Sequence, residues 1–257
     1  MKKVLLAGIL GLSLTVGAGA DVIKVSADVW EPYNNEPGAV PAGYLVDILK
    51  AVFEKQGHTI KYEVLPYSRA LKSVADGSIT AVLGSTADDN KANGLLATSH
   101  NLGLSKVVFY VKKGNPWRYS GVKSLESVLL GMPLDYNFGV EALDAYITKN
   151  KDNANRISST GGETPAVTNF RKLEGGHVGV IVDDASVAAV ALKKNGWTGV
   201  FEYAGSAGEG VPVYIGFSPK DPKSAAYVKL LDQGIGDLRR SGQLAKILEA
   251  YGLKDWE

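Results

Sequence analysis

Apolar positions in the first hundred residues switch repeatedly between the repeat of a strand and the repeat of a helix. Residues 22–27 alternate apolar and polar side chains, which predicts a strand. Residues 43–57 place apolar side chains every three or four positions, which predicts a helix. Three further elements follow: a strand at 59–64, a short helix at 68–74 and an apolar strand at 79–83. This order predicts a parallel sheet covered by helices.

A second strand and helix series begins at the β-prone run SKVVFYV, residues 105–111. The expected helices are 124–130, 140–149, 165–174, 185–194, 222–239 and 242–251, and the expected strands are 178–182 and 211–217. The glycine-rich segments 161–162 and 205–210 are interpreted as flexible loops. Two α/β halves joined by long strands predict a two-lobed molecule, with a cleft where the carboxyl ends of strands from both halves meet.

The first twenty residues have the pattern of a secretory signal peptide. Lys2 and Lys3 precede an apolar run at 4–16, and small residues at 18–20 offer an A-x-A cleavage site. The apolar run is shorter than the about 20 residues that span a bilayer, although an uncleaved anchor is the alternative. We therefore expect cleavage after Ala20 and export to the periplasm.

Composition excludes several classes of function. The chain has no cysteine, so thiol catalysis and thiolate metal sites are excluded. Lys and Arg number 28 against 27 Asp and Glu, and no basic patch indicates nucleic acid or an anionic membrane as partner. The three histidines show no metal-ligand spacing, and no nucleophile elbow or phosphate-binding glycine motif occurs. We expect no metal and no cofactor.

Several short segments, in their order and spacing, resemble the family 3 periplasmic solute-binding proteins, the receptors of polar amino-acid ABC importers. These segments are 30–33 (WEPY), 43–49 (GYLVDIL), 65–71 (LPYSRAL), 77–81 (GSITA), 172–178 (KLEGGHV) with Asp184, 214–218 (YIGFS) and 244–252. Thr80 stands where the family's G-x-I-D-A segment has Asp. The resemblance covers nearly all of 21–257.

The resemblance implies a type II periplasmic-binding-protein fold, in which each α/β lobe has a mixed, mostly parallel sheet flanked by helices. Lobe 1 is expected to comprise 21–110 and 213–257, and lobe 2 the inserted residues 111–212. The hinge would lie at 107–111 and 203–213. The implied partner of this monomeric receptor is an inner-membrane ABC permease.

In the first lobe, the candidate ligand residues follow strands or begin helices. Trp30 and Tyr33 offer rings that could stack on a ligand, or they could only shape the loop. Tyr67 and Arg69 begin a short helix, and Arg69 could hold a carboxylate or remain a solvated helix residue.

The second candidate group in lobe 1 is the Ser85–Thr86 pair, whose hydroxyls could bind an anion or merely cap a turn. Amino-acid receptors of the family carry an Arg shortly after this point. This chain has none there, and Lys91 would supply a charge without the bidentate fork.

In the second lobe, Tyr136 and Asn137 precede a helix and are candidates for polar contacts, or they form a plain turn. Asp184 ends a strand, where the family places an acceptor for the ligand's ammonium group. Its alternative role is that of a helix N-cap, although the neighbouring Asp183 could take the capping role instead.

The function expected from these residues is capture of a small polar organic ligand, an amino acid or a similar compound, in the cleft. Two alternatives stay open: a cleft enzyme of the same fold, with Glu31 or Asp184 as its acid or base, and a ligand-sensing partner of a membrane sensor.

Overall fold

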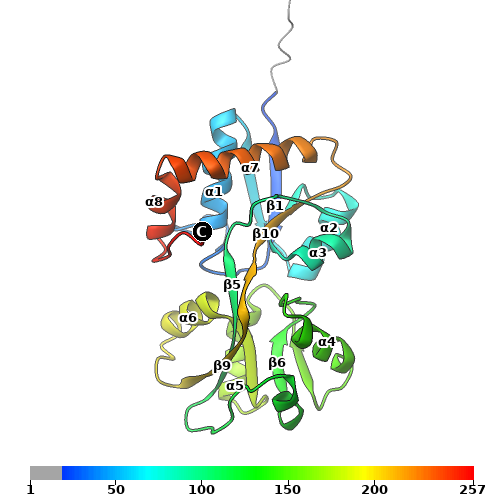
Figure 1. Cartoon of the computed structure of the whole chain (residues 1–257), viewed down its shortest axis with the longest axis vertical. Helices are drawn as coiled ribbons and strands as arrows, with labels where there is room; N and C mark the ends of the chain where they lie inside the picture. Colours follow the sequence, from blue (N-terminus) through cyan, green and yellow to red (C-terminus); the bar gives the residue numbers. More distant parts are fainter. Residues whose placement is uncertain (1–18) are drawn as a thin grey trace, which may run out of the picture.

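The computed structural model describes residues 19–257 and contains two five-stranded sheets, each flanked by helices (Figure 1). The predicted signal peptide therefore lies almost entirely outside the described residues. The described residues contain no helix with the length and apolar character needed to cross a membrane. Two α/β lobes are what the sequence pattern predicts, and the arrangement of the sheets confirms it.

The first sheet has the order β2-β1-β3-β10-β4. Strands β1, β2 and β3 are parallel to one another. Strand β10 lies between β3 and β4 and runs antiparallel to both. The strands are β1 (Val22–Ala27), β2 (Thr59–Val64), β3 (Ala81–Ser85), β4 (Leu96–Ala97) and β10 (Tyr214–Phe217). The helices of this lobe are α1 (Tyr44–Phe53), η1 (Glu54–Gln56), α2 (Tyr67–Asp76), α3 (Ala87–Asn93), α7 (Ser224–Arg240) and α8 (Gln243–Glu249).

The second sheet has the order β7-β6-β8-β5-β9, in which β6, β7 and β8 are parallel and β5 and β9 are antiparallel. The strands are β5 (Leu104–Lys112), β6 (Leu130–Pro133), β7 (Ile157–Thr160), β8 (Val180–Asp184) and β9 (Phe201–Pro212). The helices are η2 (Val122–Ser127), α4 (Glu141–Asn150), α5 (Pro165–Glu174) and α6 (Ala185–Lys194).

The strands β5 and β9 form the connection between the lobes (Figure 1). They pair from Leu104 opposite Pro212 to Lys112 opposite Phe201. The main chain stays paired one step beyond the second sheet, because Leu102 N–H donates to Val213 O and Val213 N–H donates to Gly103 O. The predicted lobe boundary at 110–111 thus falls inside β5, and the one at 212–213 falls at the end of β9.

Three local predictions were wrong. The glycine-rich segment 205–210 is part of β9 rather than a loop, and its glycines accompany register shifts in the pairing with β5. The expected strand 211–217 is two strands that belong to different sheets. The expected helix 124–130 is the 3-10 helix η2, and Leu130 already begins β6.

Helices α1 and α7 of lobe 1 pack closely against each other because a glycine of α7 lies at the contact. A Cβ atom added to Gly234 of α7 would lie 2.5 Å from Val52 Cγ1 of α1. A Cβ added to Gly236, on the same helix, would meet only the guanidinium of Arg240, at 3.2 Å.

This pair of glycines gives a matched test of the packing. Both Gly234→Ala and Gly236→Ala gain about 0.5–1 kcal/mol in helix propensity, but only the first inserts a methyl group into a filled contact. Overpacking costs about 1–3 kcal/mol. We expect urea unfolding to show Gly234→Ala less stable than the parent and Gly236→Ala equally or more stable. Equal stability of the two variants would contradict the packing described here.

Candidate functional site

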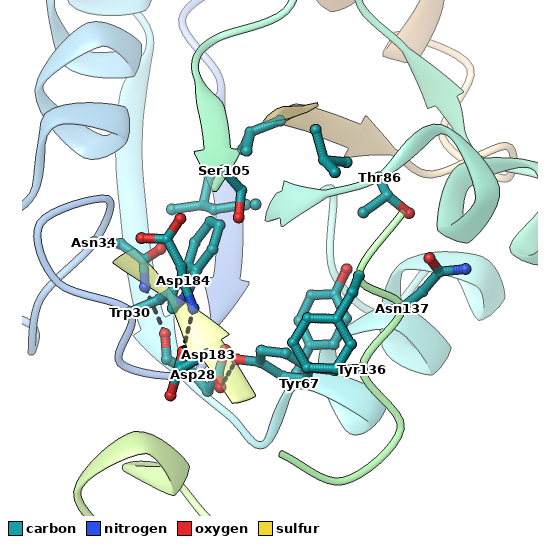
Figure 2. A pocket seen from close by; sticks show the side chains of 15 residues that line it. Asp28, Trp30, Asn34, Tyr67, Thr86, Ser105, Tyr136, Asn137, Asp183 and Asp184 are labelled. Carbon is teal, nitrogen blue, oxygen red and sulfur yellow. Dashed lines mark hydrogen bonds between the residues drawn. The ribbon is translucent and has the colours of Figure 1, made fainter. Parts of the chain in front are cut away.

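A cavity of about 40 Å³ lies where the carboxyl ends of strands from both lobes face each other (Figure 2). The residues that line it are Asp28, Trp30, Asn34, Tyr67, Leu83, Gly84, Thr86, Ser105, Tyr136, Asn137, Phe138, Asp183, Asp184, Val211 and Val213. Strand ends are where ligands bind in open α/β sheets, and here two sheets contribute them.

The aromatic wall of the cavity depends on a glycine. The rings of Trp30 and Tyr33 stack with their centroids 3.7 Å apart. Gly84, at the end of β3, has φ +77°, and a Cβ there would lie 3.0 Å from Trp30 Cε3. Only glycine satisfies both the backbone conformation and the close approach of the indole. Tyr33 itself lies behind Trp30, buried and outside the cavity lining.

Asp184 is held by the protein on all sides. Its Oδ1 caps α6 by accepting from Ser186 N–H at 2.8 Å and from Val187 N–H at 3.0 Å. Its Oδ2 accepts from Lys106 N–H at 3.0 Å and from the hydroxyl of Tyr33 at 3.1 Å. Burial raises the pKa of Asp184, whereas the hydrogen bonds from Val187, Ser105, Ser186 and Tyr33 lower it. The alternative role weighed for Asp184, that of a helix N-cap, is the one the structure shows.

Asp183, next to it, keeps one oxygen without a partner. Its Oδ1 accepts from Asp184 N–H at 2.8 Å, while Oδ2 is buried and has no hydrogen bond. Burial raises the pKa of Asp183 to about 8, helped by repulsion from Asp184 and Asp28. It does not take the capping role considered for it in the sequence. Instead, its carboxyl group lines the cavity.

Asp28 reaches the same space from the other lobe, directly after β1. It accepts from the hydroxyl of Tyr136, which belongs to lobe 2. Burial raises the pKa of Asp28 to about 7, and the bond from Tyr136 lowers it. Asn34 Nδ2 donates to Asp28 O at 2.5 Å and so fixes the backbone of this turn. Figure 2 shows Asp28 and Asp183 side by side on the floor of the cavity.

Tyr67 and Thr86 form the remaining polar wall of lobe 1, and Asp89 of α3 fixes both. Tyr67 donates to Asp89 Oδ2 at 2.7 Å. Thr86 donates to the same oxygen from its backbone N–H at 3.1 Å and from its hydroxyl at 2.9 Å. Thr86 Oγ1 in turn accepts from Asp89 N–H, which completes a capping box.

The structure brings six of the nine sequence-predicted site residues to the cavity. These are Trp30, Tyr67, Thr86, Tyr136, Asn137 and Asp184. The other three lie elsewhere: Tyr33 is behind Trp30, Ser85 is fully buried within β3, and Arg69 is exposed on α2. Lys91, considered as a substitute for the family's Arg, is exposed on α3.

Sequence reasoning missed Asp28 and passed over Asp183 as a site residue. Both carried a usable signal, because each stands at the carboxyl end of an apolar strand, as Asp184 does. Of the described residues that line the cavity, none is Lys, Arg or His. The lining therefore offers carboxyl groups, hydroxyls, amides and aromatic rings, without a fixed positive charge.

Further contacts join the lobes around the cavity. Lys194 Nζ of α6 lies 2.5 Å from Glu31 Oε2 of lobe 1. Val29 N–H donates to Glu163 O at 2.9 Å. Together with the Tyr33–Asp184 and Tyr136–Asp28 bonds, they hold the two lobes closed over the cavity.

A family model described as "Bacterial extracellular solute-binding proteins, family 3" matches residues 23–254. The chain belongs to this family. The predicted resemblance is thereby confirmed over almost the whole described chain. No curated protein matches this solute-binding protein.

Solved structures of three functional classes share the fold of this family 3 protein. A histidine kinase sensor domain similar to periplasmic binding proteins has a TM-score of 0.74 at 15% identity, covering 91% of this chain and 98% of its own. An amino acid ABC transporter substrate-binding protein from Streptococcus pneumoniae, bound to L-arginine, gives 0.70 at 16% identity, with 90% and 94% covered. An ancestral amino-acid-binding protein, a precursor of cyclohexadienyl dehydratase, gives 0.68 at 15% identity, with 90% and 95% covered. These likenesses confirm the type II periplasmic-binding-protein fold.

The Tyr33 hydroxyl joins the lobes without touching the cavity, so Tyr33→Phe tests closure separately from ligand contact. The ring stack on Trp30 is retained, and one interlobe hydrogen bond, worth about 1 kcal/mol, is lost. We expect the closed population of the unliganded protein to fall about fivefold relative to the open one, seen as a larger radius of gyration in X-ray scattering. Tyr203→Phe, at an exposed position on β9, is the control. An unchanged radius for Tyr33→Phe would show that this bond does not hold the lobes.

The raised pKa of Asp183 predicts a pH dependence of stability. Because the pKa is higher in the folded than in the unfolded chain, the folded protein binds more protons between about pH 4 and 8. The contribution of this group is fully present below the unfolded pKa and is lost as pH rises toward 8. We expect the melting temperature of the unliganded protein to fall over this range more steeply than that of Asp183→Asn. Parallel pH profiles of the two proteins would contradict the assignment.

Proposed function

We propose that this protein is a periplasmic solute receptor that captures a small polar organic ligand between its lobes and delivers it to an ABC importer. The observation that carries the proposal is a cavity lined by strand ends of both lobes, with an unpartnered buried carboxyl oxygen on its wall. Membership of an extracellular solute-binding family supports the class of function. The signal-peptide pattern of residues 1–20 supports the location.

The same arrangement supplies a mechanism for closure. A ligand shifts an open–closed equilibrium only through its different affinity for the two states. Asp28 and Trp30 come from lobe 1, whereas Asp183 and Asn137 come from lobe 2, so a ligand touches both sets only when the lobes are together. A hundredfold bias requires about 2.7 kcal/mol. Two charge-assisted hydrogen bonds, at about 1.5–3 kcal/mol each, supply it.

A cleft enzyme is the second candidate, and the Asp28–Asp183 pair is the observation that favours it. Two buried carboxyl groups with pKa values raised to about 7 and about 8 are suited to acid–base chemistry near neutral pH. In the receptor, the same groups serve as acceptors for the ligand.

The decisive experiment identifies what the exported protein carries. We expect native mass spectrometry after gentle purification from the periplasm to show one small molecule bound per chain. Adding that molecule back to stripped protein should raise the melting temperature and reduce the radius of gyration, and NMR should recover it unchanged. Consumption of the molecule would favour the enzyme. Absence of any ligand-dependent compaction would contradict the receptor.

A further inference from the structure

We propose that the cavity selects a small organic cation that has no carboxylate, such as an alkyl diamine or a guanidino amine, over the corresponding α-amino acid. This inference rests on the proposed receptor function and specifies its ligand class. Three features of the cavity carry it: a free carboxyl oxygen, the lack of an anion site, and the aromatic walls.

The first feature is a pair of acceptors with no cationic partner. Asp183 is 2% exposed, and its Oδ2 has no hydrogen bond. Asp28, also 2% exposed, receives only the hydroxyl of Tyr136 at its carboxyl group. A buried carboxylate is costly unless it is paired, and no Lys, Arg or His lines the cavity to pair it. A ligand ammonium or guanidinium group provides the missing charge and donors.

The second feature is that several donors suited to a ligand carboxylate are already used. The backbone N–H and hydroxyl of Thr86 both donate to Asp89 Oδ2. Tyr67 donates to the same carboxylate, and Tyr136 donates to Asp28. The remaining hydrogen-bond donors of the side chains that line the cavity are uncharged. One of them is the indole N–H of Trp30, which is buried without a partner.

A ligand carboxylate would also meet acidic groups from both lobes. Asp28 faces the cavity from β1, Asp183 and Asp184 face it from β8, and Asp89 lies behind Thr86 and Tyr67. Arg69 and Lys91 are exposed, and neither belongs to this lining. Electrostatic repulsion therefore penalises the α-carboxylate of an amino acid while favouring its decarboxylated analogue.

The third feature is the aromatic enclosure. Trp30 from lobe 1, Tyr67 from α2 and Tyr136 from lobe 2 surround the acidic floor, and the rings of Tyr67 and Tyr136 lie 5.0 Å apart, edge to face (Figure 2). Aromatic faces attract a desolvated cation. Leu83 and Val213 line the same cavity, and the alkyl chain of the ligand packs on them.

Binding of a cation is then linked to proton release. The titratable groups of the cavity lining are Asp28, Asp183, Asp184, Tyr67 and Tyr136, and the described lining has no basic group. The raised pKa values of Asp28 and Asp183 mean that protons compete with the ligand at neutral pH and below. Affinity for an amine that stays protonated must therefore increase as the pH rises from 6 to 8.

Matched ligand pairs test the selectivity. Isothermal titration of the stripped protein at pH 8 compares agmatine with L-arginine and cadaverine with L-lysine, because each pair differs by one carboxylate. We expect at least one of the two amines to bind at least tenfold more tightly than its amino acid and to compact the protein. If L-arginine or L-lysine binds as tightly as its amine or more tightly, or if no amine binds, the inference is overturned. The receptor function would then still be decided by the co-purified ligand.

Variants and pH provide an independent readout for whichever amine binds. Asp183→Asn should weaken binding at least tenfold, whereas Asp237→Asn, the same change at an exposed ion pair on α7, should leave it unchanged. The parent should bind at least fivefold more tightly at pH 8 than at pH 6. Equal affinity at the two pH values would overturn the inference even if Asp183→Asn failed to fold.

Discussion

The cost of burying two carboxyl groups from opposite lobes in one small cavity governs the chemistry of this protein. Asp28 follows β1 and Asp183 ends β8, and neither finds a positive charge among the described residues of the lining. Proteins seldom keep such groups without a reason, because an unpaired buried charge is strongly unfavourable. Closing the lobes therefore forces these groups either to hold protons or to acquire a cation from outside.

The frame that brings the two groups together is the antiparallel pairing of β5 with β9. Because the chain crosses between the lobes along these strands, the carboxyl ends of the parallel strands of both sheets face a common gap. The gap is then narrowed by contacts that need no ligand, including the Glu31–Lys194 ion pair and the Tyr33–Asp184 bond. The lobes are thus held together in part by contacts of protein with protein.

Most of the architecture could be predicted from the sequence because it depends on periodicity. The helices α5 and α6 have the bounds that their apolar repeats indicate, and the order of strands and helices predicts two sheets. The short strands β6 and β7 were missed because four residues carry too little pattern. The segment 205–210 was mistaken for a loop because glycine marks both turns and bulged strands.

The site was harder to predict than the fold because it depends on which way each side chain turns. Asp183 and Asp184 are adjacent in the sequence and were both seen, but only the structure shows that the second caps α6 while the first faces the cavity. The guanidinium group of Arg69 is suited to binding an anion, but Arg69 lies on the exposed face of α2. Neighbouring positions on a strand point to opposite sides, so one residue of register decides the role.

Through its two oxygens, Asp184 links the start of α6 to the Trp30–Tyr33 ring stack, which is far from it in sequence. One oxygen fixes the start of α6 and the other orients Tyr33, against which the indole of Trp30 rests. Loosening the first turn of α6 would therefore tilt an aromatic surface on the opposite lobe. Substitutions along α6, which contributes no residue to the cavity lining, offer an evolutionary route by which the ligand preference of this protein could change.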